Sequence, residues 1–291
     1  PSTVFNIGTT TITYVVTDIA GNTATCAFDV VVTDNEDPIV TCIGDQTESA
    51  DAACMFTMAD YIGLITASDN CDMSLTYVQT PAAGSMVSGT QAVTIDVIDD
   101  AGNTTTCSFN VVVTDTTDPI ITTCAPDVTE LVDGSCEFTL PDYTSLVVAT
   151  DNCDLSLTYV QVPAAGTVIS GHGTVQNVVI TVTDDNGNAT SCSFDVTLDD
   201  QIDPTITCAA NVNVDTDAGV CSATLVPSAP VFADNCIVDA VTYTLTGATT
   251  DVSPASGINI VPSTVFAIGT TTITYVVTDI AGNTATCSFD V

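Results

Sequence analysis

The chain has 291 residues, of which 45% are hydrophobic, and it contains 36 Asp and Glu residues but no Lys or Arg, so its formal net charge is −36. Because no basic side chain is present to neutralise phosphates, the composition argues against binding of nucleic acid or of acidic membranes. It also rules out lysine Schiff bases and arginine clamps, and the single histidine, His172, leaves little for acid–base chemistry. We therefore expect no catalytic residues and no enzyme activity.

The charge imbalance indicates a positive partner from solution. Folded domains that carry many carboxylates and no cationic side chain repel themselves, and no internal salt bridge relieves the repulsion. Most of the acidic residues are Asp, and they gather in short polar segments, which favours a hard cation held through oxygen, above all Ca²⁺. The alternative is that the acidity serves only solubility or a halophilic environment.

The 13 cysteines recur at regular spacing, which indicates disulfides and an oxidising, extracellular environment. No apolar run reaches transmembrane length, and no signal peptide is recognisable. Because Pro1 begins in the middle of a repeating pattern, we expect a segment of a longer exported chain, with no membrane insertion in this segment.

Residues 1–33 read as two β-strands joined by a turn. Apolar and polar residues alternate over 11–17 and again over 26–33, as they do in half-buried strands. The turn between them, Asp18–Asn22, contains a glycine that supplies the positive φ such turns need. Residues 1–30 return as 262–291 with only two changes, so we expect 1–33 to be the C-terminal half of a domain.

The next segments, in chain order, form a pattern that recurs along the chain. A linker at 34–37 precedes expected strands at 39–42 and 55–58, an acidic loop at 68–72 and a turn at 99–103. Recurrence of this order predicts complete domains with their linkers at 34–114, 115–198 and 199–291, after the half-domain at 1–33. The alternative for the half-domain is completion by strands of another chain.

The run T-x-T-Y-x-V-x-D-x-x-G-N-x-x-x-C-x-F-x-V, followed by D-P-x-I and later D-N-C, resembles the hyalin repeat (HYR) family. The resemblance covers every repeat, although Asp-Pro stands where many members have Pro-Pro, and the basic residues usual in the family are missing. It implies extracellular, immunoglobulin-like modules in tandem, associated with adhesion. Together with the strand pattern, it predicts an all-β fold of tandem immunoglobulin-like β-sandwich domains in an elongated array.

Counting strands places the linker, the D-N-C loop and the last turn of each repeat at one end of its domain. Their oxygen atoms then converge, which suits Ca²⁺ because this ion takes six to eight oxygen ligands. The alternative is that these residues only make turns and cap backbone groups. The candidate ligands are Asp34, Glu36, Asp37, Asp69, Asp72, Asp99, Asp100 and Asn103 in the first complete repeat, Asp115, Asp118, Asp151, Asp154, Asp184, Asp185 and Asn188 in the second, and Asp199, Asp200, Asp203, Asp234, Asp239, Asp279 and Asn283 in the third.

Four cysteines in each complete repeat allow three pairings. The first and fourth open strands near the linker end, and the HYR resemblance implies the same pair, because shorter members keep only these two; the second and third are then left for each other. This second pair requires the intervening segment to fold back. Cys26 is expected to be unpaired. The preferred pairs are Cys42–Cys107, Cys124–Cys192 and Cys208–Cys287, with Cys54–Cys71, Cys136–Cys153 and Cys221–Cys236.

These features predict a structural repeat protein of an extracellular (secreted or cell-surface) filament or stalk, stiffened by Ca²⁺ at the junctions and by disulfides. Its expected partners are calcium ions and copies of itself or further repeats. The alternatives are a tandem adhesin that binds carbohydrate or protein through exposed loops, and a spacer in a large enzyme. Asn103 and Asn188 match the glycosylation pattern but lie in the turns assigned to Ca²⁺, so we expect neither to be glycosylated. His172 is expected to be an exposed loop residue.

Overall fold

A computed structural model of the protein describes residues 2–291, so Pro1, the first residue of the predicted half-domain, lies outside it. The fold is all-β, as predicted, with two short 3₁₀ turns as its only helical elements in the described part of the chain. The chain separates into two compact units: unit 1 contains residues 1–117 and 151–155, and unit 2 contains 118–150 and 156–291. The predicted domain boundaries therefore stay predictions. No helix among the described residues is long and apolar enough to cross a membrane.

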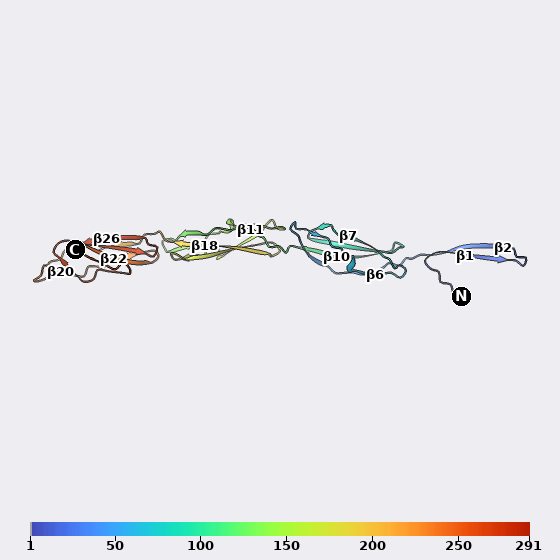
Figure 1. The fold of residues 1–291 in the computed structure, drawn as a ribbon, viewed down its shortest axis with the longest axis horizontal. Coiled ribbons are helices and arrows are strands. Elements are labelled where there is room, and N and C mark those ends of the chain that lie inside the picture. The colour runs from blue at the N-terminus through green and yellow to red at the C-terminus, as the bar shows by residue number, and fades with distance from the viewer. Residues whose placement is uncertain (1) are drawn as a thin grey trace. The chain divides into compact units, whose positions relative to one another are not determined.

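Unit 1 begins with an antiparallel hairpin of β1 (Gly8–Thr17) and β2 (Thr23–Val32), which forms a sheet of its own (Figure 1). The alternation of side chains gives it one apolar face, but that face is open. Tyr14 is 58% and Phe28 51% exposed, whereas the equivalent Tyr275 and Phe289 in unit 2 are 0% and 3% exposed. The same sequence is therefore part of a core at one place and uncovered at the other.

The rest of unit 1 has one four-stranded sheet, ordered β4-β10-β9-β7, and two small sheets, β3-β6 and β5-β8. Apolar and polar residues alternate over 93–97 of β9, and Val93, Ile95 and Val97 are fully buried, as expected of a half-buried strand. The elements are β3 (Ile39–Thr41), β4 (Gln46–Ser49), β5 (Phe56–Thr57), η1 (Ile62–Leu64), β6 (Thr66–Ser68), β7 (Thr76–Thr80), β8 (Met86–Val87), β9 (Thr90–Ile98) and β10 (Thr104–Thr114).

Unit 2 repeats this arrangement with the sheets β12-β18-β17-β15, β11-β14 and β13-β16. In both units a tyrosine a few residues after the third short strand (β5 or β13) packs edge-on against a phenylalanine of the long strand: Tyr61 on Phe109 and Tyr143 on Phe194. The elements are β11 (Ile120–Thr123), β12 (Val128–Leu131), β13 (Glu137–Thr139), η2 (Thr144–Leu146), β14 (Val148–Thr150), β15 (Thr158–Val162), β16 (Val168–Ser170), β17 (Val175–Thr183) and β18 (Ala189–Asp199).

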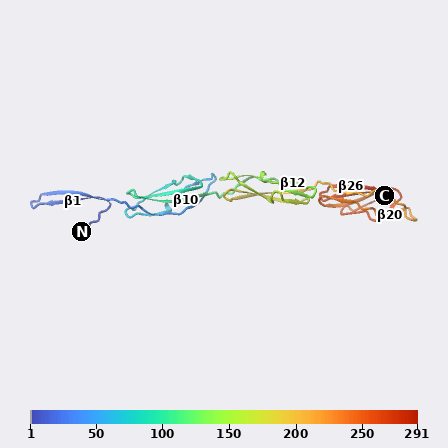
Figure 2. The ribbon, with the colours of Figure 1, turned by 180° about the vertical axis from the view of Figure 1, so that it is seen from behind.

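A second core in unit 2 follows the same scheme with two changes. Among its described residues, the four-stranded sheet has no parallel edge strand equivalent to β4 or β12, and it has an additional strand at the opposite edge. Its main sheet is β23-β22-β25-β26, in which a new edge strand, β23, lies beside β22. Figure 2 labels β26, the last strand of this sheet. The small sheets are β19-β21 and β20-β24. The elements are β19 (Thr205–Thr207), β20 (Ser222–Leu225), β21 (Val231–Ala233), β22 (Val238–Gly247), β23 (Asp251–Val252), β24 (Thr264–Ala267), β25 (Thr271–Asp279) and β26 (Thr284–Asp290).

Strands β4 and β12 were not predicted from the sequence. Each pairs in parallel with the end of the long strand: Gln46 lies opposite Val111 and Val128 opposite Val196. The expected second strand at 55–58 is reduced to β5. Between the first and the second cysteine of such a repeat, the chain thus passes from the small sheet with β3 or β11 to the four-stranded sheet with β4 or β12.

Five disulfides are present in the described chain, and the three pairs of first and fourth cysteines are confirmed. Cys26 is free, as predicted. The three predicted pairs of second and third cysteines, Cys54–Cys71, Cys136–Cys153 and Cys221–Cys236, are wrong. The second cysteine instead bonds the third cysteine of the following repeat, in Cys54–Cys153 and Cys136–Cys236, and Cys71 and Cys221 are free and exposed.

Strand β4 explains this correction. Because β4 runs beside the last residues of β10 and Ala50 N–H donates to the Thr114 carbonyl at 2.9 Å, Cys54 lies where β10 ends. Cys71 follows β6, which pairs with β3 where β10 begins. An 11-residue strand is about 35 Å long. Cysteines at its two ends cannot reach the Cα separation of about 6 Å that a disulfide needs.

Candidate metal centre

Three acidic segments of unit 1 meet because of the strand pairing around them. Ile39 at the start of β3 lies opposite Ser68 at the end of β6, which brings the loop after Ser68 beside the linker. Thr105 Oγ1 donates to the Pro38 carbonyl at 2.6 Å, which brings the turn before β10 to the same place. The convergence predicted by counting strands is therefore present, although β4 was missed.

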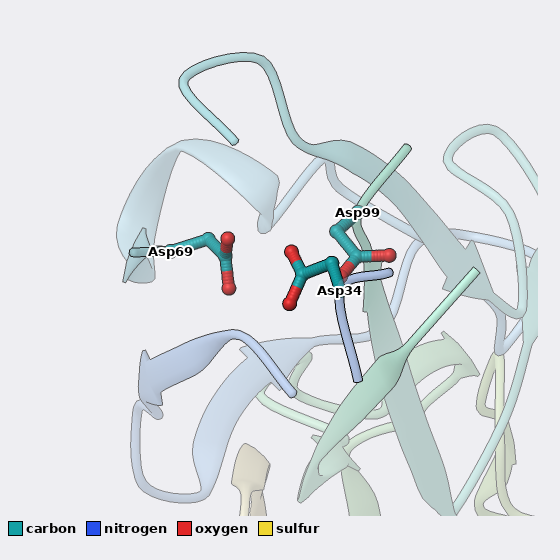
Figure 3. A group of neighbouring side chains, drawn as sticks. All are labelled: Asp34, Asp69 and Asp99. Atoms are coloured by element: carbon teal, nitrogen blue, oxygen red, sulfur yellow. The ribbon is translucent and has the colours of Figure 1, made fainter. Parts of the chain in front are cut away.

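One carboxylate from each segment contributes to a cluster: Asp34 of the linker, Asp69 of the D-N-C loop and Asp99 of the turn (Figure 3). Each offers an oxygen atom within 4.8 Å of the other two. Asp99 is buried, and the other two are half-buried. Oxygen atoms that share one Ca²⁺ at 2.3–2.6 Å lie no more than about 5 Å apart, so this spacing suits a single ion.

Hydrogen bonds from the backbone hold these carboxylates in place. Asp69 Oδ1 accepts the N–H groups of Cys71 and Asp72 at 2.8 and 2.9 Å. Asp99 accepts both the backbone and the side-chain N–H of Asn103 at 2.7 Å. Burial raises the pKa of Asp99, but the hydrogen bonds from Asn103 outweigh it, so the pKa lies below its usual value. The turn therefore keeps this carboxylate charged.

Unit 2 contains an equivalent cluster of Asp200, Asp234 and Asp279, again with oxygen atoms within 4.8 Å of one another. It is more buried, since Asp200 is 2% and Asp279 1% exposed. Asn283 donates to Asp279 Oδ2 at 2.8 Å and to the Asp200 carbonyl at 3.0 Å. The turn and the linker are thus joined by one asparagine.

The buried cluster of unit 2 has oxygen atoms that no donor satisfies. Oδ2 of Asp200, Oδ1 of Asp234 and Oδ1 of Asn235 are buried and have no hydrogen-bond partner within the described chain. A buried charge without a partner costs several kcal/mol, and the chain has no Lys or Arg to supply one. The donor set, made only of oxygen, fits a hard divalent cation such as Ca²⁺.

The other predicted ligands of these two repeats lie around the clusters and not in them. Asp72 accepts the Asp100 N–H at 2.8 Å and so ties the loop to the turn. Glu36 accepts from the Asn70 side chain. Asn103 and Asn283 donate to the aspartates and so position them. Among the predicted ligands of these two repeats, the ones with exposed side chains are Glu36, Asp37, Asp100, Asp203 and Asp239.

The predicted middle site stays a prediction from the sequence, because its residues are divided between the units. Unit 1 holds its linker and loop residues Asp115, Asp151 and Asp154, and unit 2 holds the others. The local structure is nevertheless the same as in the other repeats. Asp151 accepts the Cys153 and Asp154 N–H groups. In unit 2, Asp118 accepts the Ala189 N–H. Asp184, next to Asp185, accepts the backbone and the side-chain N–H of Asn188. Burial raises the pKa of Asp184, but these hydrogen bonds outweigh it, so the pKa lies below its usual value.

His172 differs from its prediction. It is half-buried beside the linker that contains Asp199 and Asp200. Its Nδ1 accepts the Asp200 N–H at 3.2 Å and lies 3.4 Å from an Asp199 carboxylate oxygen. His172 therefore contacts the linker rather than solvent alone.

The asparagine of the D-N-C motif has a role that was not predicted from the sequence. Asn152 donates to the Asp51 carbonyl at 3.0 Å, and Asn235 donates to the Asp133 carbonyl at 3.1 Å. Each asparagine thus contacts the turn that carries the partner of the neighbouring cysteine. The repetition of Asn in all three motifs was the available signal.

A family model described as the HYR domain matches residues 1–32 and 199–291. Among curated proteins, hyalin of Strongylocentrotus purpuratus is 28% identical over 303 aligned residues, which include 100% of this chain and 24% of hyalin. Hyalin of Lytechinus variegatus is also 28% identical, over 98% of this chain and 52% of its own length. The chain thus spans about a quarter to a half of these relatives.

The solved structures that match this chain include extracellular cadherin domains. Protocadherin Gamma B2 domains 1–5 match 98% of this chain and 65% of their own, with 14% identity and a TM-score of 0.33. Mouse Cadherin-23 EC22-24 matches 88% of this chain and 98% of its own, with 15% identity and a TM-score of 0.35.

Proposed function

This chain is a protein of the HYR-domain family, and we propose that it is a structural repeat protein of an extracellular filament or stalk, stiffened by Ca²⁺ at its inter-domain junctions and by disulfides. Each recurring set of sheets is, in this proposal, an immunoglobulin-like sandwich. The similarity to hyalin along the whole chain and the disulfides support an extracellular location.

The observation that carries the proposal is the buried cluster of Asp200, Asp234 and Asp279. Its carboxylates come from a linker, a loop and a turn, and two of its buried oxygen atoms have no donor within the described chain. A divalent cation would neutralise these charges and fill the open coordination positions. The residues were recognisable as a set only because they recur in each repeat.

Binding of Ca²⁺ there would restrict the linker. Asp200 lies in the segment between β18 and β19, whereas Asp234 lies in the loop directly after β21 and Asp279 is the last residue of β25. An ion shared by the three fixes the linker to the domain after it. Without the ion, the same carboxylates repel each other and the junction loosens.

The disulfide Cys136–Cys236 supports the same function by a covalent route. It joins the turn before β13 to the loop before β22, so it crosses from one predicted domain to the next. Asp234 and Cys236 belong to one D-N-C motif, and Asp234 Oδ2 accepts the Cys236 N–H at 2.8 Å. The metal cluster and the bridge therefore share one loop.

Thermal unfolding with disulfides intact tests the proposal, in millimolar Ca²⁺ and in excess EDTA at fixed ionic strength. A ligand present at about 100 times its Kd stabilises the folded state by about 2.7 kcal/mol. We expect Ca²⁺ to raise the midpoint of the wild type, and Na⁺ not to replace it. Equal midpoints in Ca²⁺ and EDTA would contradict the proposal and favour acidity that serves solubility.

Two matched substitutions locate the effect. Asp234→Asn removes a charge from the buried cluster, whereas Asp239→Asn removes one from an exposed position only a few residues away in β22. We expect Asp234→Asn to lose most of the stabilisation by Ca²⁺ and Asp239→Asn to keep it. Equal losses in both would indicate a general effect of surface charge.

A further inference from the structure

The disulfides between neighbouring repeats follow one rule. The second cysteine of a repeat bonds the third cysteine of the repeat after it, at sequence separations of 99 and 100 residues. These two bonds use four of the six second and third cysteines within residues 2–291. The other two are Cys71, which is the third cysteine of its repeat, and Cys221, which is the second of its own. Both are free and exposed.

Each bond has the same surroundings. The second cysteine, Cys54 or Cys136, has a left-handed backbone with φ of 57° or 60°, at the end of a turn that starts with an aspartate. The carbonyl of that aspartate accepts from the asparagine that precedes the third cysteine. A disulfide and an adjacent hydrogen bond therefore form the contact between the two segments.

Cys221 ends a turn of the same kind. Asp217 begins it, and the Asp217 carbonyl accepts the Val220 N–H as the Asp51 carbonyl accepts that of Cys54. The turn is one residue longer, and Gly219 takes the left-handed backbone with φ of 80°. The Asp217 carbonyl is thus in the position that accepts an asparagine in the other two turns.

Cys71 lies in a loop of the same kind as its bonded equivalents. The carboxylate of Asp69 accepts the Cys71 N–H at 2.8 Å, as Asp151 and Asp234 accept the N–H groups of Cys153 and Cys236. Its neighbour Asn70, which has no turn to contact here, donates to Glu36. This loop therefore supplies the asparagine and the third cysteine of the contact, whereas Cys221 and its turn supply the second cysteine and the accepting carbonyl.

The repeat of 1–30 as 262–291 shows which partner fits. The half-domain directly before the repeat that contains Cys71 is almost identical to the end of the repeat that contains Cys221. The repeat expected before Cys71 is therefore of the same kind as the one that contains Cys221. We propose that Cys221 forms a disulfide with the Cys71 position of a second copy of this three-repeat unit, accompanied by a hydrogen bond from Asn70 to the Asp217 carbonyl. The contact would continue the series of inter-repeat disulfides from unit to unit.

The bond forms by thiol–disulfide exchange with a low-molecular-weight disulfide such as oxidised glutathione. One thiolate attacks this disulfide and forms a mixed disulfide, with release of one small thiol. The second cysteine thiolate then attacks the protein sulfur of that mixed disulfide and releases the second small thiol. The two cysteine thiols lose two protons and two electrons in total, and the small disulfide is reduced to two thiols. The exchange needs no Ca²⁺, so its outcome is separate from that of the proposed function.

The experiment uses the full chain with Cys26→Ser, so that Cys71 and Cys221 are the only unpaired cysteines left. Chains with Cys71→Ser keep only Cys221, and chains with Cys221→Ser keep only Cys71. They are refolded in a glutathione redox buffer with EDTA, separately and as an equal mixture. Non-reducing gels and mass spectrometry of linked peptides then identify the products.

We expect the mixture to give a covalent dimer that dithiothreitol reverses, linked from Cys221 to Cys71, in at least about tenfold excess over the dimers of either chain alone. Chains that keep both cysteines should form longer series, and chains with both replaced should stay monomeric. Equal amounts of Cys221–Cys221 and Cys221–Cys71 links would overturn the proposal, because they would show random oxidation of exposed thiols.

A second arm tests the case in which the second copy is part of the same polypeptide. Two units are joined in the register of the repeat, with Val31 directly after Val291 of the first. We expect a link between Cys221 of the first unit and Cys71 of the second in the monomeric product. A link here but not between separate chains assigns the contact to successive units of one chain. Alkylation of both cysteines by iodoacetamide in both arms would overturn the proposal.

Discussion

Removal of the Cys136–Cys236 disulfide should lower the stability of unit 2 by about 4 kcal/mol. The sequence separation is 100 residues, for which loop entropy in the unfolded chain gives about 4.7 kcal/mol. With Cys124–Cys192 intact, however, the shortest closed loop has about 56 residues, which reduces the figure to about 4 kcal/mol. For a unit of this size, the expected decrease in Tm is about 8–16 °C.

The assay is thermal unfolding followed by circular dichroism for Cys136→Ser, Cys236→Ser and the double variant. Because both single changes break the same bond, the double variant should melt where the single variants melt. Cys136→Ser and Cys153→Ser belong to different bonds, so their effects should add. The variant Cys71→Ser/Cys221→Ser is the matched control and should melt like the wild type, because both cysteines are free.

Two results would refute this reasoning. If Cys136→Ser and Cys236→Ser were additive while Cys136→Ser and Cys153→Ser were not, the pairing would be the one between neighbours within a repeat. If all variants melted like the wild type, the bridge would not constrain the unfolded chain. Mapping of linked peptides from the wild type separates these two cases.

Three further predictions concern the core, the turns and the metal cluster. Gln161→Ala should lower the free energy of unfolding, measured in urea, by about 2–3 kcal/mol, because it leaves the buried Tyr143 N–H and the Pro141 and Pro163 carbonyls without their partner. Gln201→Ala, at an exposed position, should have little effect. In EDTA, the free energy of unfolding should fall as the pH drops through and below 3.8. The lowered pKa values of Asp99 and Asp184 stabilise the folded state only while both carboxylates are charged. Equal urea midpoints at about pH 6 and about pH 2.5 would contradict this. Asn283→Ala should weaken Ca²⁺ binding at least about tenfold in calorimetric titrations, and an unchanged affinity would mean that Asn283 does not position the cluster.

The long hairpins could be predicted because their signal is local. Alternation of β-branched and polar residues around an Asp-x-x-Gly-Asn turn determines both strands and their register. Strand β4 has no such signal, since its sequence Gln-Thr-Glu-Ser is polar throughout. It exists because it pairs in parallel with residues 65 positions later, a contact that no local pattern encodes.

The candidate site could be predicted as a region but not residue by residue. Repetition identified the three acidic segments, and their strands brought them together. The sequence could not show which linker aspartate turns inward: Asp200 is buried, whereas Asp203 is exposed. Asp239, another candidate ligand of the third repeat, lies within β22, where its side chain is exposed.

The disulfides within and between repeats limit how far the chain can lengthen under force. If tension unfolded unit 2, the residues between Cys124 and Cys192, and those between Cys208 and Cys287, would stay bridged at their ends. Only the roughly 16 residues between Cys192 and Cys208 could extend, to about 55 Å. Cys136–Cys236 adds a second covalent path around that segment. Pulled in a force spectrometer from Cys124 to Cys287, oxidised unit 2 should therefore gain little contour length, and reduced unit 2 should extend many times further.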